Sequence, residues 1–489
     1  MNSIVESIKH FANVSPDKIA VIAEDEEITY SELYKKISAF AAHLVKRGIK
    51  VGDNVIIKGI PSIDFAVAVF GTHLCGAVNV STEKTLGDDG LVAMIERMHA
   101  KLLVADEKPE GTDVDFIVKT DVRKVPDCEY QGEMPTGDML CDILFTTGST
   151  GQSKGVMLSH RNIVAVSENM NHSINYLKDN VYMIAAPINH AAAIRKLYVS
   201  MFTGTTAVLF DGFMNLKGYF TYMEKYHVTS CHMPPSAIHM LVQLAAKKLS
   251  EFSDQLDHIH AGSAALPETD KEKISEILPD SRLIFAYGSS EAGCVSLYDF
   301  ASYQGKINCV GKPNVNAEIF MVDDDKKPYK ATKENPGRIA IKGDMVMQGY
   351  YKDEELTKTV IDENGVFYTS DLGYIDDEGF IYMVGRADDV INVGGLKIAP
   401  TEVEHEVLRM EGIVEAACFA TDNKLTGKVP NLAVVMAEGY EFDGKAIAKF
   451  LFENLEAYKV PKNIFPVDEI PKKPNGKYDR TNFYKLAEK

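Results

Sequence analysis

Short apolar runs alternate with helical patterns over the first 300 residues, and this alternation strongly constrains the fold. Residues 19–23 and 102–105 consist of aliphatic residues and alanine, as buried strands do. Between them, Thr29 and Glu32 form a capping-box pattern, and the apolar residues that follow recur at helical spacing. Strands that alternate with helices indicate a largely parallel sheet covered by helices. We therefore predict an α/β fold for this part of the chain.

The pattern changes twice toward the end of the chain. After about residue 310, short alternating runs such as 318–322 and 338–341 predict a small antiparallel part packed on the larger body. The last hundred residues predict a separate α+β unit, with strands near 390–393, 414–420 and 431–437 and helices near Pro400 and 444–454. Residues 106–140 are polar and contain proline, so we expect a surface connection there. A chain of 489 residues is long enough for two or more domains.

Composition narrows the possible partners and the compartment. The net charge of −18 argues against nucleic acid, and it means that an anionic ligand must be held by local donors. The seven cysteines are scattered without a C-x-x-C pair, which favours reduced thiols over disulfides or a zinc site. No segment approaches the roughly twenty apolar residues of a membrane span, and no secretion signal precedes the first helix. We expect a cytoplasmic protein.

A loop rich in glycine and hydroxyl side chains runs from Thr146 to Gly155, directly after the apolar run 143–145. Glycine allows several backbone N–H groups to point inward, and the hydroxyls and Lys154 supply further donors, so the loop suits a phosphate. It does not match the Walker A pattern, because Ser153 precedes Lys154 and Gly155 follows it. A flexible Gly/Ser turn remains an alternative interpretation of these residues alone.

Further short motifs follow this loop in order along the chain. They are Pro187-Ile188-Asn189-His190, Gly262-Ser263-Ala264-Ala265-Leu266, Tyr287-Gly288-Ser289-Ser290-Glu291, Gly349-Tyr350-Tyr351, Tyr368-Thr369-Ser370-Asp371, Gly385-Arg386-Ala387-Asp388, Gly394-Gly395-Leu396-Lys397 and Pro474-Asn475-Gly476-Lys477. Together they resemble the motifs of the AMP-forming adenylating enzymes, which include acyl- and aryl-CoA synthetases, peptide-synthetase adenylation domains and firefly luciferase. The resemblance covers nearly the whole chain.

The resemblance implies a site for ATP and Mg²⁺. Ser290 would meet the α-phosphate, Glu291 would hold Mg²⁺, and Asp371 and Arg386 would bind the ribose. The residues implied in nucleotide binding are Thr146, Thr147, Gly148, Ser149, Thr150, Gly151, Lys154, Gly262, Ser263, Ala264, Tyr287, Gly288, Ser289, Asp371 and Arg386. Lys154 would assist pyrophosphate binding and departure.

The resemblance also implies a mobile C-terminal domain. Residues 1–386 would form the adenylating domain and residues 387–489 the mobile one, with Asp388 as the hinge. Gly394 and Gly395 would line the tunnel for the pantetheine arm of the thiol substrate, and Lys477 would catalyse adenylation. His190 would gate the carboxylate pocket.

Elementary chemistry is consistent with these roles. Adenylation brings one anion against the α-phosphorus of another, so the protein must position the reactants and stabilise negative charge. Lys477, Mg²⁺ on Glu291 and the loop N–H groups would do this. Taken singly, each residue also has an ordinary interpretation: a solvated basic tail for Lys477, a turn cap for Asp371, a surface ion pair for Arg386 and a core histidine for His190.

The acid pocket is less well defined by the sequence. After His190 come three alanines, which leave room for a chain or ring, and then Arg195 and Lys196. Either cation could pair with a second carboxylate of the substrate, or both could belong to a solvated basic turn. No aspartate stands near this point as in the amino-acid-activating branch, which disfavours amino acids. Arg338 replaces the glutamate usual in the family, and the sequence offers no reason for it.

We predict an ATP-dependent, AMP-forming carboxylic acid–CoA ligase with ATP, Mg²⁺ and CoA as cofactors and a small carboxylic acid as substrate. The first alternative is a stand-alone adenylating enzyme that loads a separate phosphopantetheinyl carrier protein. We expect no fused carrier domain, because the sequence ends shortly after Lys477. The second alternative is a degenerate nucleotide-binding regulatory protein. The identity of the acid and the oligomeric state do not follow from the sequence.

Overall fold

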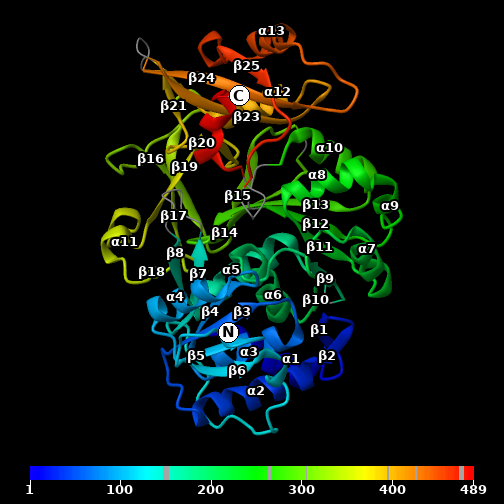
Figure 1. Ribbon diagram of the computed structural model, residues 1–489, viewed down its shortest axis with the longest axis vertical. Coiled ribbons are helices and arrows are strands. Elements are labelled where there is room, and N and C mark those ends of the chain that lie inside the picture. Colours follow the sequence, from blue (N-terminus) through cyan, green and yellow to red (C-terminus); the bar gives the residue numbers. More distant parts are fainter. Residues whose placement is uncertain are drawn as a thin grey trace.

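The computed structural model describes residues 1–146, 153–177, 179–262, 266–303, 305–393, 396–423, 427–472 and 478–488 (Figure 1). Two large sheets form most of the molecule, and a smaller α+β body that contains the C-terminus lies at the far end of the long axis. No helix in these ranges is both long enough and apolar enough to cross a membrane.

The seven-stranded sheet has the order β18-β8-β7-β4-β3-β5-β6. Its strands are β3 (Asn54–Gly59), β4 (Val78–Glu83), β5 (Leu102–Ala105), β6 (Asp115–Val118), β7 (Leu140–Thr146), β8 (Lys154–Ser159) and β18 (Gly349–Tyr350). Strands β3 to β7 pair in parallel, whereas β8 and β18 continue the sheet in antiparallel fashion. The expected surface connection over 106–140 therefore contains a strand, β6. Its apolar run, residues 116–118, has three residues and is shorter than the four or more that usually indicate a strand.

The second sheet has thirteen strands, in the order β16-β17-β19-β20-β15-β14-β13-β12-β11-β9-β10-β1-β2. They are β1 (Ile19–Ala23), β2 (Glu26–Thr29), β9 (Val181–Ile184), β10 (Thr206–Leu209), β11 (Ser230–Met233), β12 (His258–Gly262), β13 (Arg282–Ser289), β14 (Gly293–Asp299), β15 (Cys309–Pro313), β16 (Glu318–Val322), β17 (Gly337–Lys342), β19 (Phe367–Ile375) and β20 (Ile381–Arg386). The small antiparallel part predicted after residue 310 is confirmed, since β15, β16, β17, β19 and β20 pair in antiparallel fashion. It is joined to the larger sheet because β15 also pairs with β14.

Helices cover both sheets, as Figure 1 shows. They are α1 (Ile4–Val14), α2 (Tyr30–Lys46), α3 (Ile63–Leu74), α4 (Asp88–Met98), α5 (His160–Ile174), α6 (Ala191–Thr203), α7 (Leu216–Lys225), α8 (Pro235–Leu244), α9 (Ala246–Ser250), α10 (Glu268–Ile277), α11 (Glu354–Val360), α12 (Pro400–Val407) and α13 (Gly444–Asn454), with short 3₁₀ turns at Lys119–Asp121, Ala457–Lys459 and Arg480–Glu488. The predicted capping box is confirmed, since the Thr29 hydroxyl accepts a hydrogen bond from the Glu32 N–H and the Glu32 carboxylate accepts one from the Thr29 N–H, both at 3.2 Å.

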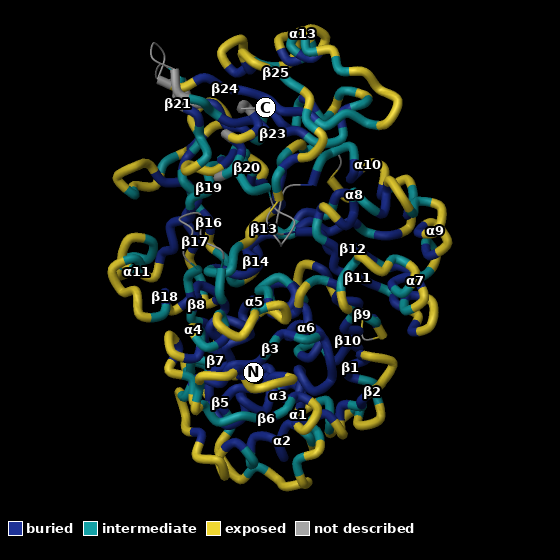
Figure 2. Tube along the Cα trace, viewed as in Figure 1, coloured by how far each residue is buried: buried dark blue, intermediate teal, exposed yellow. Residues whose placement is uncertain are grey.

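The C-terminal body has its own hydrophobic core. Strands β21 (Ile391–Val393) and β22 (Leu396–Ile398) form a hairpin, and β23 (Ile413–Asn423), β24 (Gly427–Met436) and β25 (Asn463–Pro466) form a three-stranded sheet. The apolar residues buried here begin at Ile391, whereas the large core of the molecule ends at Ile381. Figure 2 shows buried residues along the strands and exposed ones on the peripheral loops. The boundary predicted after residue 386 lies between the two cores, and the movement of this body stays a prediction.

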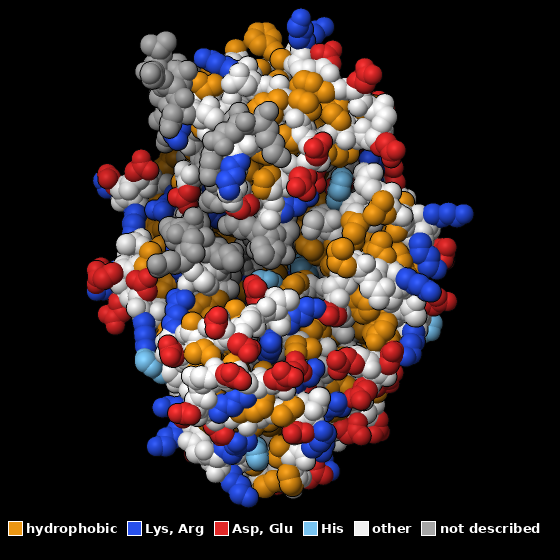
Figure 3. Space-filling view, in the orientation of Figure 1, with side chains coloured by type: hydrophobic (Ala, Val, Ile, Leu, Met, Phe, Trp, Pro, Cys, Tyr) orange, Lys and Arg blue, Asp and Glu red, His pale blue; other side chains and the backbone are white. Residues whose placement is uncertain are grey.

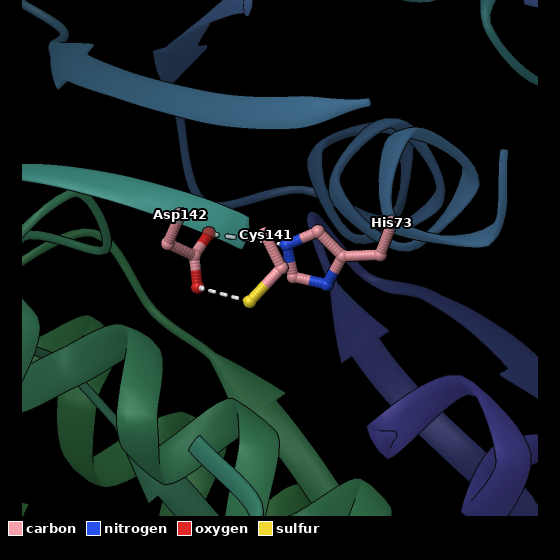
Figure 4. A group of neighbouring side chains, drawn as sticks. All are labelled: His73, Cys141 and Asp142. Carbon is pink, nitrogen blue, oxygen red and sulfur yellow. Dashed lines mark hydrogen bonds and ion pairs between the residues drawn. The ribbon is translucent and has the colours of Figure 1, made fainter. Parts of the chain in front are cut away.

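A buried carboxylate joins the seven-stranded sheet to two helices, α3 and α6. Asp142 on β7 accepts hydrogen bonds from His73 Nε2 (3.1 Å) on α3, Asn79 Nδ2 (2.7 Å) on β4 and the Tyr198 hydroxyl (2.9 Å) on α6. His73, Cys141 and Asp142 lie close enough together to bind a metal ion (Figure 4). Because the oxygens of Asp142 already accept from three donors and all three residues are buried, we interpret the group as structural.

This network makes a prediction about stability and pH. Burial raises the pKa of the Asp142 carboxyl, but the His73 imidazole and the hydrogen bonds outweigh burial and hold it below its usual value. Asp142→Asn should therefore lower the free energy of unfolding at pH 7 by about 3–5 kcal/mol in a denaturant titration. Because the folded-state pKa is lowered, the difference should be complete above the unfolded pKa of about 4 and shrink as the pH falls below it.

The matched control for this substitution is Asp138→Asn. Asp138 is exposed and pairs only with Arg161, so its loss should change the unfolding free energy by less than about 1 kcal/mol. An Asp142→Asn protein as stable as the Asp138→Asn protein at pH 7 would contradict the structural role.

Candidate active site

The glycine-rich loop joins two antiparallel strands. Strand β7 ends at Thr146, β8 begins at Lys154, and these two residues lie opposite each other. A Walker A loop runs from a strand into a helix, so the structure agrees with the sequence in excluding that architecture. Lys154 places its Nζ 5.4 Å from the centre of the Tyr350 ring. Thr147, Gly148, Ser149, Thr150 and Gly151 lie outside the described residues.

The parallel strands of the larger sheet bring several predicted residues to one edge. Strands β9, β11, β12 and β13 all pair in parallel, so their carboxyl ends lie at the same edge of the sheet. Gly262 ends β12, Ser289 ends β13, and His190 follows β9 as the N-cap residue of α6. Ligands of open α/β sheets bind outside this edge. Ser263 and Ala264, predicted to contact adenine, lie outside the described residues.

The turn after β13 has a fixed backbone. A Cβ on Gly288 would lie 1.7 Å from the carbonyl oxygen of Gly293, so only glycine fits. The Ser289 hydroxyl accepts a hydrogen bond from the N–H of Ala292 at 3.2 Å. Arg195 on α6 donates to the carbonyl oxygens of Ser289 (2.8 Å) and Ser290 (2.6 Å). The turn therefore holds Ser290 and Glu291 at the edge of the sheet.

Arg195 belongs to the framework of this site. Burial lowers the pKa of its guanidinium to about 10, and the carboxylate of Glu291 partly offsets this, so it stays charged at neutral pH. The solvated basic turn considered for Arg195 and Lys196 is wrong, because both residues lie on α6 and both are buried. The sequence could not show that Arg195 binds backbone carbonyls, because those oxygens belong to the turn after β13.

Glu291 connects the turn to the glycine-rich loop. The Tyr350 hydroxyl donates to its Oε1 at 2.9 Å, and the Met347 N–H donates to its carbonyl oxygen at 2.7 Å. Burial and the neighbouring Glu291 raise the pKa of Tyr350, so the phenol remains a donor. Tyr350 thus lies between Lys154 on one side and Glu291 on the other. The motif Gly349-Tyr350-Tyr351, which the sequence left without a role, supplies this link.

A second group surrounds Asp371 on β19. The Tyr287 hydroxyl donates to Asp371 Oδ2 at 2.8 Å, and Asp371 lies opposite Arg386 in the pairing of β19 with β20. Burial and the nearby Asp371 raise the pKa of Tyr287, which therefore donates at any physiological pH. Arg386 is exposed and lies 3.5 Å from Asp388. The two residues predicted to bind ribose are thus neighbours, and Tyr287 connects them to the turn that carries Glu291.

The structure explains Arg338. Its Nε donates to the carbonyl oxygen of Thr369 at 2.6 Å, and the Thr369 hydroxyl accepts from the N–H of Asp371 at 3.0 Å. Arg338 therefore fixes the strand that carries Asp371. The sequence could not show this, because the acceptor is a backbone oxygen on the neighbouring strand.

The carboxylate of Glu291 offers the kind of oxygen ligand that suits Mg²⁺. Mg²⁺ is usually bound by one or two carboxylates together with water and substrate phosphates. Glu291 is a half-buried carboxylate with one oxygen bound to Tyr350, and no described residue donates to the other oxygen. Figure 3 shows acidic and basic side chains interspersed on the face in view, so a bound anion depends on local donors such as Lys154.

Some predicted residues cannot be placed. Gly394, Gly395 and Lys477 lie outside the described residues. Asp388 is described: it is exposed and lies in the turn between β20 and β21. The structure thus brings together Thr146, Lys154, Glu291, Asp371 and their neighbours, and the role of the C-terminal lysine stays a prediction.

Comparison with known proteins agrees with this geometry. The family model for AMP-binding enzymes matches residues 8–351, and the model for the C-terminal domain of AMP-binding enzymes matches residues 402–477. The 2-succinylbenzoate–CoA ligase of Bacillus licheniformis is 29% identical over 97% of this chain and 98% of its own. The 4-coumarate–CoA ligase 1 of Narcissus pseudonarcissus is 25% identical over 93% of this chain and 87% of its own.

Two solved structures share the fold. ATP-bound MatB from Rhodopseudomonas palustris superimposes with a TM-score of 0.90 at 24% identity, covering 100% of this chain and 99% of its own. O-succinylbenzoate coenzyme A synthetase (MenE) from Bacillus subtilis, in complex with ATP and magnesium, superimposes with a TM-score of 0.86 at 24% identity. The match covers 98% of this chain and 99% of its own. Since the family match spans more than half of the sequence, this chain belongs to the family of AMP-binding enzymes.

Proposed function

We propose that this protein is an ATP-dependent, AMP-forming carboxylic acid–CoA ligase. The observation that carries the proposal is the connected set Lys154, Tyr350 and Glu291 beside Tyr287 and Asp371, at the carboxyl edge of the parallel strands. This set provides a cation, a carboxylate suited to Mg²⁺ and a carboxylate suited to ribose hydroxyls in one place. The curated relatives described above are CoA ligases that align with nearly the whole chain.

In the first step the substrate carboxylate attacks the α-phosphorus of ATP, and the bond to pyrophosphate breaks. Lys154 and the loop N–H groups would bind the departing phosphates, and Lys477 would bind the reacting oxygens. When bound, Mg²⁺ would neutralise phosphate charge. Glu291 would hold it, with its carboxylate oriented by Tyr350. Asp371 and Arg386 would fix the ribose and thereby the direction of attack.

In the second step the thiol attacks the acyl carbonyl and AMP leaves. Pyrophosphate and Lys477 have no place in this geometry, so we propose that the C-terminal body rotates about Asp388 between the steps. Two observations support this: the body has its own core, and Asp388 is exposed. Side-chain hydrogen bonds across the junction include His405 to Asn308 (2.7 Å) and Thr401 to the carbonyl of Val384 (3.2 Å).

The experiment that tests the function is acid-dependent pyrophosphate release. Fatty, aromatic and dicarboxylic acids are each supplied with ATP and Mg²⁺, with and without CoA, and acyl-CoA is measured by mass spectrometry. We expect pyrophosphate release and CoA-dependent AMP release with at least one acid class. If the acyl group is transferred only to a phosphopantetheinyl carrier, the acceptor is a carrier protein and not CoA. No release with any acid would favour a regulatory nucleotide-binding protein.

Glu291→Gln should alter the dependence on Mg²⁺. The amide cannot supply the negative charge that Mg²⁺ prefers, so the Mg²⁺ concentration for half-maximal adenylation should rise at least about tenfold. The control is Glu355→Gln on α11, an exposed carboxylate that pairs only with Lys358. An unchanged Mg²⁺ titration in Glu291→Gln would exclude this residue as the metal ligand.

Lys477→Ala should impair only the first step. Loss of one donor to the developing charge should lower the adenylation rate about 100- to 1000-fold, whereas thioester formation from supplied acyl-AMP should persist. Lys472→Ala is the matched control, because Lys472 is a nearby lysine whose ammonium pairs with Glu415. If both variants adenylate at the wild-type rate, the catalytic assignment of Lys477 is wrong.

Asp388→Pro should impair only the second step. Proline fixes φ near −65° and so restricts rotation at this residue, whereas Asp388→Ala leaves the backbone free to rotate. We expect pyrophosphate exchange near the wild-type rate in both variants and acyl-CoA formation reduced about 100-fold in the proline variant alone. Equal rates of acyl-CoA formation in the two variants would place the hinge elsewhere.

A further inference from the structure

Lys196 on α6 is a buried lysine that the proposed mechanism does not use, and burial lowers the pKa of its ammonium to about 7. Its Nζ lies 3.1 Å from Nε2 of His260 and 3.7 Å from Sδ of Met170. The residue is 5% exposed. In the described parts of the chain, no carboxylate lies within ion-pair distance of it.

The other buried lysines show how unusual this is. Lys271 pairs with Glu268 at 2.7 Å and Lys459 with Glu402 at 2.8 Å. Lys119 lies within 4 Å of both Glu24 and Asp106. An unpaired buried charge costs several kcal/mol in general, so a buried charged group is paired, binds a ligand or shifts its pKa toward the neutral form. Of the four buried lysines that the structure describes, Lys196 alone has no acidic partner.

The surroundings of Lys196 are also electropositive or neutral. His260 on β12 lies opposite His232 on β11, with ring centroids 5.9 Å apart. Burial, together with Lys196, lowers the pKa of both histidines, that of His232 to about 3, so both rings are neutral. Nδ1 of each ring is buried without a described hydrogen-bond partner. Lys196, His260 and His232, which we call the Lys196 cluster, thus offer donors to an anion that the protein itself does not supply.

The position of the cluster favours the acid substrate as the source of that anion. Helix α6 begins directly after His190, and Lys196 lies about 9 Å along its axis at 1.5 Å per residue. The preceding residue, Arg195, reaches the turn that carries Glu291. His260 is the middle residue of β12, two residues before Gly262, so it lies buried beneath the carboxyl edge of the sheet. A molecule whose first carboxylate lies near His190 would reach the Lys196 cluster by extending inward from that edge.

We propose that the Lys196 cluster binds a second carboxylate of the acid substrate, so that the enzyme selects dicarboxylic acids. This inference rests on the proposed function and names its substrate class. A carboxylate beside Lys196 stabilises its ammonium form, and the imidazole rings supply further hydrogen bonds. A monocarboxylic acid with an apolar tail offers no partner to this buried polar group, and the cost of that opposes its binding.

The test compares ligands that differ by one charge. Dicarboxylic acids of three to eight carbons and their monomethyl esters are assayed by acid-dependent pyrophosphate release. For the preferred chain length we expect kcat/KM of the wild-type protein to be about 100-fold higher with the diacid than with its half-ester. In Lys196→Met, whose side chain is apolar and of similar length, the ratio should fall close to one.

Stability gives a second, independent readout. If Lys196 were structural, its loss would destabilise the protein. If it is a binding group, Lys196→Met replaces a buried polar group that has no acidic partner and should raise Tm or leave it unchanged. Lys271→Met is the matched control, because it removes a buried lysine that has an acidic partner. That variant should lose stability and keep the wild-type ratio of diacid to half-ester.

The outcomes separate this inference from the proposed function. If the wild-type protein uses monocarboxylic acids or half-esters at least as well as diacids, or if Lys196→Met keeps the preference for diacids, this inference is overturned and the ligase function stands. If Lys196→Met fails to fold, the wild-type ratio alone decides. If no acid of any class supports pyrophosphate release, the ligase function fails, and the inference fails with it.

Discussion

The carboxylate of Asp142 is the buried charge on which the arrangement of the site depends. It lies on β7, four residues before the start of the glycine-rich loop, and it holds Tyr198 on α6, the helix that follows His190. A single anion therefore positions the strand that leads to the glycine-rich loop and the helix that begins after His190. Replacing it with an apolar residue would leave three buried donors unpaired, so the loss of this one carboxylate would disrupt the whole network.

Much of the fold and of the site could be predicted from the sequence, because the relevant signals are local. The capping box at Thr29 lies within four residues, and the order of motifs that indicated an adenylating enzyme is confirmed by the family match. Strand β6 was missed because its apolar run of three residues is short and lies in an otherwise polar segment, and its pairing with β5 is not visible in the sequence. Arg195 and Arg338 could not be interpreted, because both bind backbone oxygens of segments far away in the sequence.

The two neighbouring cations on α6 illustrate different ways of accommodating buried charge. Arg195 gives two of its N–H groups to backbone carbonyls and thereby becomes part of the framework. Lys196 has a neutral imidazole and a thioether beside it, and burial lowers the pKa of its ammonium to about 7. Arg195 makes the turn that carries Glu291 rigid, whereas Lys196 has no acidic partner within the described structure. Adjacent positions in one helix thus have different environments, and the proposed selection of diacids depends only on the second.

Strand β18 has a consequence for the order in which the protein is made. The seven-stranded sheet is built from residues 54–159 except for this strand, which supplies residues 349–350 and pairs with the outer edge of β8. On the ribosome, that edge stays open while almost two hundred further residues are synthesised, and an open edge invites pairing with other chains. The lysine at the start of β8 limits this risk. The same two residues that close the sheet bring Tyr350 to Glu291, so a nascent chain closes this edge and links it to the turn after β13 in one event.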